Sequence, residues 1–139
     1  MKKAEFILIA SFFIMTIFSC SKEKAPLITG EWKVTDIAFS EKVSPEMEVA
    51  LKETLEETKK SSSWTINENG TFTRKIGEDS SSGKWVLSPD SKKLTLTYQD
   101  GEIEVSDILE LTENKLVVTY RIDETEYKNT YEKKTAVSN

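Results

Sequence analysis

Bulky and polar side chains alternate along most of the chain after residue 63, and this alternation predicts a succession of strands. Leu94, Leu96 and Tyr98, for instance, alternate with Thr95 and Thr97, which is typical of a strand with one buried face. Short turns separate most of these runs, so we expect consecutive strands to pair as an antiparallel meander. The pattern predicts eight strands, over residues 30–39, 63–67, 71–76, 83–87, 92–98, 102–111, 115–122 and 125–133.

Turn-forming residues mark the ends of these strands. Asn67–Gly70, Ser88–Ser91 and Asp100-Gly101 have the composition of tight turns, whereas residues 77–83 are predicted to form a longer polar loop. The alternation slips near Asp36 and again near Asp107, where a strand is expected to bulge or bend.

Eight meandering strands favour one fold class. Such a sheet removes its exposed edges by closing on itself, so the predicted fold is all-β, an eight-stranded antiparallel barrel. An open barrel and a two-sheet sandwich are the alternatives.

One helix interrupts the pattern after the first strand. Ser44 is a favourable N-cap and Pro45 suits the first helical position. An apolar stripe then recurs at helical spacing, formed by Met47, Ala50, Leu51, Leu55 and Thr58. We expect this amphipathic helix to pack its stripe against the domain, for instance across a barrel mouth. A binding face for a partner is the alternative.

The predicted barrel interior is rich in bulky side chains. Eight strands enclose a space that side chains fill or that holds one small ligand, so we expect at most a shallow pocket at one mouth. Arg74 shares a face with Phe72 and Ile76, and we expect its side chain to reach solvent near a strand end. If that face is interior, the buried arginine would need a partner and would mark a binding site for an anionic group. The predicted inward set comprises Trp32, Val34, Trp64, Ile66, Phe72, Trp85, Leu87, Leu94, Leu96, Tyr98, Leu116, Val118, Tyr120, Ile122, Tyr127 and Tyr131. The candidate pocket residues are Trp64, Phe72, Arg74, Trp85, Tyr98, Tyr120 and Tyr127.

The first 20 residues have the features of an export signal. Lys2 and Lys3 precede an apolar run over residues 6–18, which is too short for a comfortable transmembrane helix. The run ends in Ile17-Phe18-Ser19-Cys20, which resembles a lipobox, the recognition sequence of bacterial lipoprotein signal peptidase. We therefore expect a signal peptide over 1–19, a tether lipidated at Cys20 over 20–27, a domain over 28–134 and a disordered tail over 135–139. The lipid on Cys20 is expected to anchor the protein in the outer membrane.

Composition argues against several other functions. The net charge of the full sequence is −5. Residues 1–19 carry Lys2, Lys3 and Glu5, a net +1, so the mature chain would carry −6. Its basic residues form no dense patch of the kind that binds nucleic acid. Histidine is absent and there is one cysteine, so the commonest general base and the thiolate metal sites are excluded. Glu102 and Glu104 share a strand face that is expected to be exposed, which is unsuited to paired acid–base chemistry. We expect no catalysis, no metal and no cofactor.

Several short motifs together resemble a known family. Gly30-x-Trp32, Asn69-Gly70-Thr71-Phe72, Gly83-Lys84-Trp85 and Leu94-Thr95-Leu96 occur in the order and spacing of lipocalin-like domains of bacterial lipoproteins. The resemblance implies that Trp32 packs across the closed end of a barrel, where the family often supplies an arginine; here the last strand ends in Lys133-Lys134. It also implies a binding or structural module rather than a catalyst. From the eight-strand pattern with its helix we expect a lipid-anchored module that binds a small apolar or amphipathic ligand. The alternative is a scaffold lipoprotein that docks to another envelope protein through its surface or helix.

Overall fold

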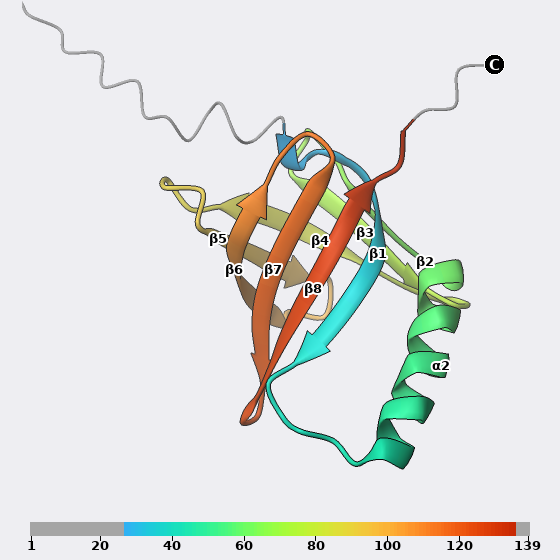
Figure 1. Ribbon diagram of the computed structural model, residues 1–139. Coiled ribbons are helices and arrows are strands. Elements are labelled where there is room, and N and C mark those ends of the chain that lie inside the picture. Colours follow the sequence, from blue (N-terminus) through green and yellow to red (C-terminus); the bar gives the residue numbers. More distant parts are fainter. Residues whose placement is uncertain (1–26, 136–139) are drawn as a thin grey trace, which may run out of the picture.

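The computed structural model describes residues 27–135, which form a closed antiparallel barrel with one flanking helix (Figure 1). Each strand pairs with the next along the chain, and the last strand pairs with the first. The predicted barrel is therefore confirmed, and the open and sandwich alternatives are excluded. The elements are β1 (Gly30–Phe39), α2 (Pro45–Ser61), β2 (Ser62–Ile66), β3 (Thr71–Ile76), β4 (Asp79–Leu87), β5 (Lys93–Tyr98), β6 (Ile103–Leu111), β7 (Lys115–Ile122) and β8 (Thr125–Lys133).

The strand β4 is longer than the alternation predicts. Residues 77–83 were expected to be a loop, but Ser80, Ser81 and Ser82 pair with β3, and the turn is confined to Gly77 and Glu78. Gly77 takes a φ of +61°, which a two-residue turn favours in glycine. This end of the hairpin is exposed, so its residues carry no apolar alternation and the strand could not be recognised from its pattern.

Two β-bulges bend the barrel wall. The register of β1 against β8 shifts between Val34 and Asp36, where the alternation slips in the sequence. The second shift lies in β6, between Ile108 and Glu110, slightly later than the slip predicted at Asp107. Leu109 occupies this second bulge and is exposed.

The core fills the end of the barrel where β1 begins. Trp32 is fully buried there, and its indole N–H donates to the carbonyl of Ile28 at 2.7 Å. The Nζ of Lys133 lies 4.8 Å from the centroid of the Trp32 ring and donates to the carbonyl of Leu27 at 2.8 Å. We call this the closed end. Ile122 was expected to point inward, but it is exposed because it lies at the opposite end, where β7 runs past the core.

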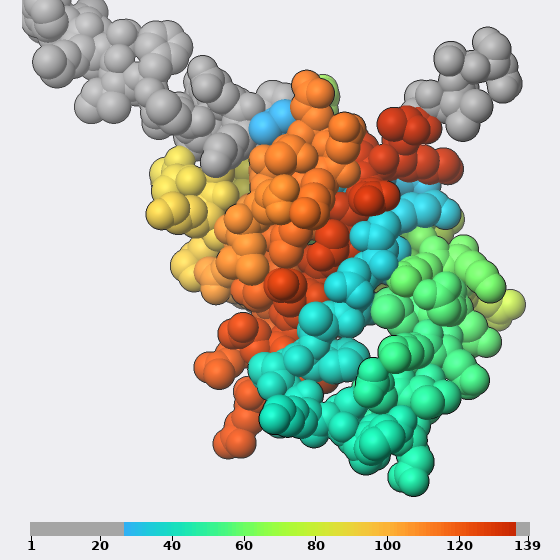
Figure 2. Space-filling view, in the orientation of Figure 1, coloured from blue at the N-terminus to red at the C-terminus, as the bar shows by residue number. Residues whose placement is uncertain are grey.

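The helix α2 begins as predicted but packs less closely than predicted. The hydroxyl of Ser44 accepts a hydrogen bond from the backbone N–H of Met47 at 3.3 Å, so the cap is confirmed. No residue of α2 is buried, and Met47 is 56% exposed, so the expected packing of the whole apolar stripe is wrong. Figure 2 shows an open gap between the helix and the segment after β1, because this segment leads away from the barrel. Leu51 and Leu55, nearer the end of the helix, are half-buried.

The expected signal peptide, the lipidated Cys20 and residues 136–139 of the expected tail lie outside the described residues. Between residues 27 and 135, no helix combines the length and the apolar character needed to cross a membrane.

Candidate ligand-binding cavity

A cavity of about 140 Å³ lies at the end of the barrel opposite the closed end, beside the last turn of α2. It arises because β1 and β2 pair at only three positions, which match Gly30–Trp32 with Trp64–Ile66. Beyond them, β1 follows β8 and β2 follows β3, so the wall opens. The lining includes Trp32, Val34 and Ile37 of β1, Thr58 of α2, Ser62 and Trp64 of β2, Arg74 of β3, Tyr120 of β7, and Asn129 and Tyr131 of β8.

Aromatic rings form one wall of the cavity. The rings of Trp64 and Tyr131 meet edge to face with centroids 5.1 Å apart. The guanidinium carbon of Arg74 lies 4.8 Å from the centroid of the same Trp64 ring, which is a cation–π contact. This stacking joins the apolar wall to the charged group beside it.

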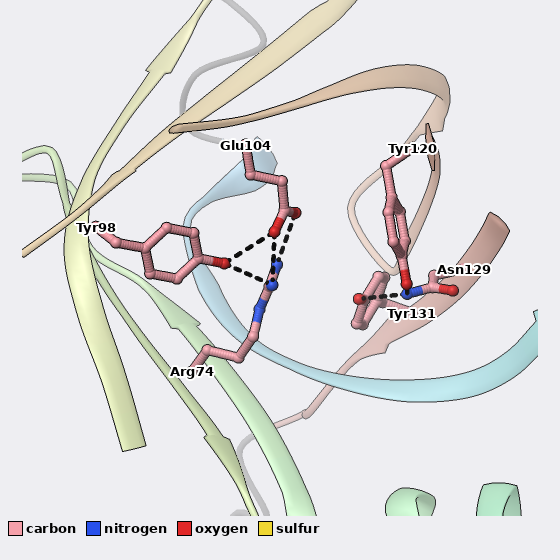
Figure 3. A network of polar contacts seen from close by, with 6 residues as sticks. All are labelled: Arg74, Tyr98, Glu104, Tyr120, Asn129 and Tyr131. Carbon is pink, nitrogen blue, oxygen red and sulfur yellow. Dashed lines mark hydrogen bonds and ion pairs between the residues drawn. The ribbon is translucent and has the colours of Figure 1, made fainter. Parts of the chain in front are cut away.

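Arg74 forms an ion pair inside the barrel mouth (Figure 3). Its Nη1 and Nη2 donate to the two carboxylate oxygens of Glu104 at 3.2 Å and 3.4 Å, and Nη1 also donates to the hydroxyl of Tyr98 at 2.8 Å. The Tyr98 hydroxyl in turn donates to Glu104 at 2.9 Å. The side chains of Arg74 and Glu104 are only 20% and 26% exposed. A charged group with so little contact with water needs a partner of opposite charge, and each of these two residues provides it for the other.

The expected exposure of Arg74 and Glu104 is therefore wrong. Along β6, Ile103 is 63% exposed and Val105 is 51% exposed, whereas Glu104 between them points inward. The register of β6 explains this orientation, because Glu104 and Ser106 are paired with the buried Leu96 and Leu94 of β5 and therefore share their inward face. An interior Arg74 was expected to need a partner, and Glu104 is that partner.

The titration behaviour of these groups agrees with the contacts. Burial alone would lower the pKa of Arg74, but the nearby Tyr131, Glu104 and Tyr98 outweigh it and raise the pKa. Burial raises the pKa of the Tyr98 hydroxyl well above its ordinary value, against the opposing effect of Arg74. At neutral pH Arg74 therefore carries its positive charge, and the Tyr98 hydroxyl keeps the proton that it donates to Glu104.

Asn129 is a lining residue that was not among the candidates. Its side-chain nitrogen donates to the hydroxyls of Tyr131 at 3.1 Å and Tyr120 at 3.5 Å, and Figure 3 shows this nitrogen next to both hydroxyl oxygens. The available signal was its place in the alternation of Tyr127, Asn129 and Tyr131, which puts a polar amide on the inward face of β8.

Several buried polar atoms around the cavity have no hydrogen-bond partner among the described residues. They are Ser62 Oγ, Trp64 Nε1, Arg74 Nε and Asn129 Oδ1, and all four belong to lining residues. Buried polar groups are normally paired, so a cluster of unpaired ones beside a cavity is unusual.

The structure brings three of the seven candidate pocket residues to the cavity, namely Trp64, Arg74 and Tyr120. The other four do not line it. Phe72 is buried in the core against Tyr98, Trp85 donates its indole N–H to the carbonyl of Asn67 at 2.8 Å, and Tyr127 stacks behind Tyr120 at 5.3 Å. Alternation identifies an inward face but not the depth of a side chain along the barrel, so it could not separate these four residues from those that line the cavity.

Comparison with known proteins agrees with the observed architecture. The family model of the lipocalin-like domain matches residues 28–118, while no curated protein matches the chain. Among solved structures, the barrel is similar to a DUF4847 family protein from Bacteroides vulgatus, with 12% identity, a TM-score of 0.56, and coverage of 81% of this chain and 99% of that chain. A bovine odorant-binding protein, solved with a selenium-containing odorant, matches at 16% identity with a TM-score of 0.47, over 81% of this chain and 73% of that chain. Since the family model covers more than half of the sequence, the chain belongs to the lipocalin-like domain family.

Proposed function

We propose that this protein is a lipid-anchored, non-catalytic binding protein of the bacterial envelope that holds a small apolar or amphipathic ligand in the barrel cavity. The observation that carries the proposal is the cavity of about 140 Å³ at the open end of a closed barrel. A cavity of about 150 Å³ holds a molecule the size of benzene, so the ligand would place one ring or a short chain inside. A longer ligand would extend past α2 into solvent.

The chemistry of the lining fits an amphipathic ligand. Val34, Ile37 and the ring of Trp64 offer apolar surface, whereas Arg74 and Asn129 place polar groups on other parts of the wall. Small-molecule sites typically combine a mostly apolar lining with a few polar groups that fix the orientation of the ligand. Glu104 is held by Arg74 and Tyr98 and is thus not free to act as a general acid or base.

The proposed anchor gives the barrel an orientation. Cys20 would reach residue 27 through a short tether, and residue 27 lies at the closed end, beside Lys133. An acyl anchor at Cys20 would therefore hold the closed end towards the membrane and direct the cavity mouth away from it. Mass spectrometry of the detergent-extracted protein tests the anchor, because an unmodified Cys20 would refute it.

Binding can be tested with fluorobenzene, observed by ¹⁹F NMR, because this probe has the size of the cavity. We expect saturable binding to the native protein and at least about tenfold weaker binding to Ile37→Phe, which places extra carbons at the cavity. Ile103→Phe is the matched control, since Ile103 lies exposed on the outer wall. Absence of binding to the native protein, or equal loss in both variants, would contradict the proposal.

A scaffold function is the second candidate, and exposed apolar side chains favour it. Val86 and Val105 lie in one row across β4, β5 and β6, and both are exposed on the outer wall. Met47 and Val49 are exposed on α2. A photo-crosslinking residue at Val49 in cells would capture an envelope protein if α2 docks, whereas recovery of monomer alone would exclude docking through this helix.

A further inference from the structure

We infer that the cavity selects a neutral ligand that carries a hydroxyl group, in preference to a purely apolar ligand or an anion of the same size. This inference rests on the proposed binding function and goes beyond it by naming the ligand chemistry. It depends on two observations, the neutralised ion pair beside the cavity and the unpaired polar atoms around it.

The ion pair argues against an anionic ligand. The guanidinium of Arg74 already directs both terminal nitrogens to Glu104 and one of them also to Tyr98. A carboxylate in the cavity would have to displace Glu104 from this bidentate contact and then lie near its negative charge. A ligand cation would likewise meet the guanidinium. The pair therefore disfavours a charged ligand group beside Arg74, and Lys75, the other charged residue of the lining, is exposed.

The unpaired atoms argue for a hydroxyl group. Trp64 Nε1 and Arg74 Nε each carry an N–H that lacks an acceptor among residues 27–135, so the ligand should offer an oxygen. One atom of the Asn129 amide and the hydroxyl of Ser62 also lack partners there. A ligand hydroxyl can accept from one of the N–H groups and donate to an oxygen, whereas a hydrocarbon leaves all of these groups unpaired.

These atoms come from side chains that are close to one another. Trp64 and Arg74 are paired across β2 and β3 and stack, while Ser62 is two residues before Trp64 on the same face. On the other side, Trp64 touches Tyr131, whose hydroxyl receives the hydrogen bond from Asn129. One small ligand in the cavity therefore lies among all of these residues.

A series of fluorinated benzenes tests the inference on the native protein, with ¹⁹F NMR at neutral pH as the readout. 4-Fluorophenol is expected to bind about tenfold more tightly than fluorobenzene and than 4-fluorobenzoate, the gain of roughly one hydrogen bond. If no compound binds, the proposed function itself fails. If fluorobenzene and 4-fluorophenol bind equally, the binding function survives and the hydroxyl preference is refuted. Tightest binding of 4-fluorobenzoate would instead show an anion site and overturn the inference.

A pair of tryptophan variants locates the preference. Trp64→Phe keeps an aromatic ring but removes the unpaired N–H, so the advantage of 4-fluorophenol over fluorobenzene should fall severalfold. Trp85→Phe is the matched control, because the N–H of Trp85 already donates to Asn67 and this side chain does not line the cavity. An unchanged preference in Trp64→Phe, or an equal loss in both variants, would contradict the assignment. Ser62→Ala supplies a second, smaller change should Trp64→Phe fold poorly.

Discussion

The ammonium group of Lys133 stands over the indole ring of Trp32, 4.8 Å from its centroid, and joins the last strand to the first at the closed end. The same ammonium donates to the carbonyl of Leu27, just before the barrel. Lysine thus takes the place for which the family resemblance suggested arginine. A cation above an indole ring is favourable by about 0.5–2 kcal/mol, depending on how far it is desolvated.

Lys133→Met should lower the free energy of unfolding by about 1–2 kcal/mol, because it removes both the cation–π contact and the hydrogen bond to Leu27. Lys133→Arg should retain most of that stability. The measurement is urea denaturation. Lys134→Met is the control, since Lys134 forms an exposed ion pair with Glu31 of the kind that adds little. Equal effects at both lysines would refute the role of Lys133.

Gly83→Ala is expected to destabilise the barrel by about 3 kcal/mol, near the upper end of the effects of overpacking. A Cβ at Gly83 would lie 2.0 Å from the carbonyl oxygen of Thr97, which is backbone of the neighbouring strand and cannot move aside without breaking the ladder. Gly77→Asn serves as the control, because there is open space at Gly77 and asparagine tolerates its positive φ. A thermal melt in which Gly83→Ala matches the native protein would contradict this close approach.

Stability should fall as the solution becomes alkaline. Burial raises the pKa of Tyr98, Tyr120 and Tyr131 in the folded protein. Their contribution is therefore fully present below pH ~10, the ordinary tyrosine pKa, and is lost above it, because the unfolded chain releases these protons first. Each tyrosine contributes a slope of up to about 1.4 kcal/mol per pH unit in that range. Burial lowers the pKa of Lys133, and this shift makes the folded state more stable as the pH rises. Because one lysine acts against three tyrosines, we still expect a net loss of stability.

Denaturant titrations from neutral to alkaline pH, with tyrosine ionisation followed by absorbance, measure this dependence. Tyr131→Phe should make the alkaline loss of stability shallower. A stability that stays constant well above pH ~10 would be inconsistent with buried neutral tyrosines.

Hydrogen exchange should separate α2 from the barrel. The helix has no buried residue, whereas Leu116, Val117 and Val118 of β7 are buried. Amides of α2 should therefore exchange about a hundredfold or more faster than those of β7, through local opening. Ser44→Ala should accelerate exchange in α2 further without changing the melting temperature of the barrel. Equal protection of the helix and β7 would show that α2 is part of the cooperative core.

Much of the barrel was predictable because strands and turns are recognised from residues that are neighbours in the sequence. The alternation of Leu94, Leu96 and Tyr98 and the turn at Asn67–Gly70 depend on neighbours in sequence, and both appear in the structure as predicted. The orientation of β6 was different. Its apolar Ile103 and Val105 face out because the register against β5 pairs Glu104 with the buried Leu96, and this register cannot be read from β6 itself.

The cavity was beyond prediction for a related reason. It exists because β1 and β2 separate after Trp32 and Trp64, and that divergence is set by which strand each follows afterwards. Asn129 is recognisable as a site residue only once Tyr120 and Tyr131 are known to flank it. Alternation placed these side chains inside the barrel but could not show which of them meet.

The most direct test of ligand binding in the cavity uses the indole N–H signals of the three tryptophans in ¹⁵N-labelled protein. Titration with 4-fluorophenol should shift the Trp64 signal most and to saturation, because its N–H has no partner in residues 27–135 and the residue lines the cavity. The signals of Trp32 and Trp85 should move less, since their N–H groups donate to Ile28 and Asn67. A titration that leaves the Trp64 signal in place, or that moves Trp85 as much as Trp64, would contradict the account.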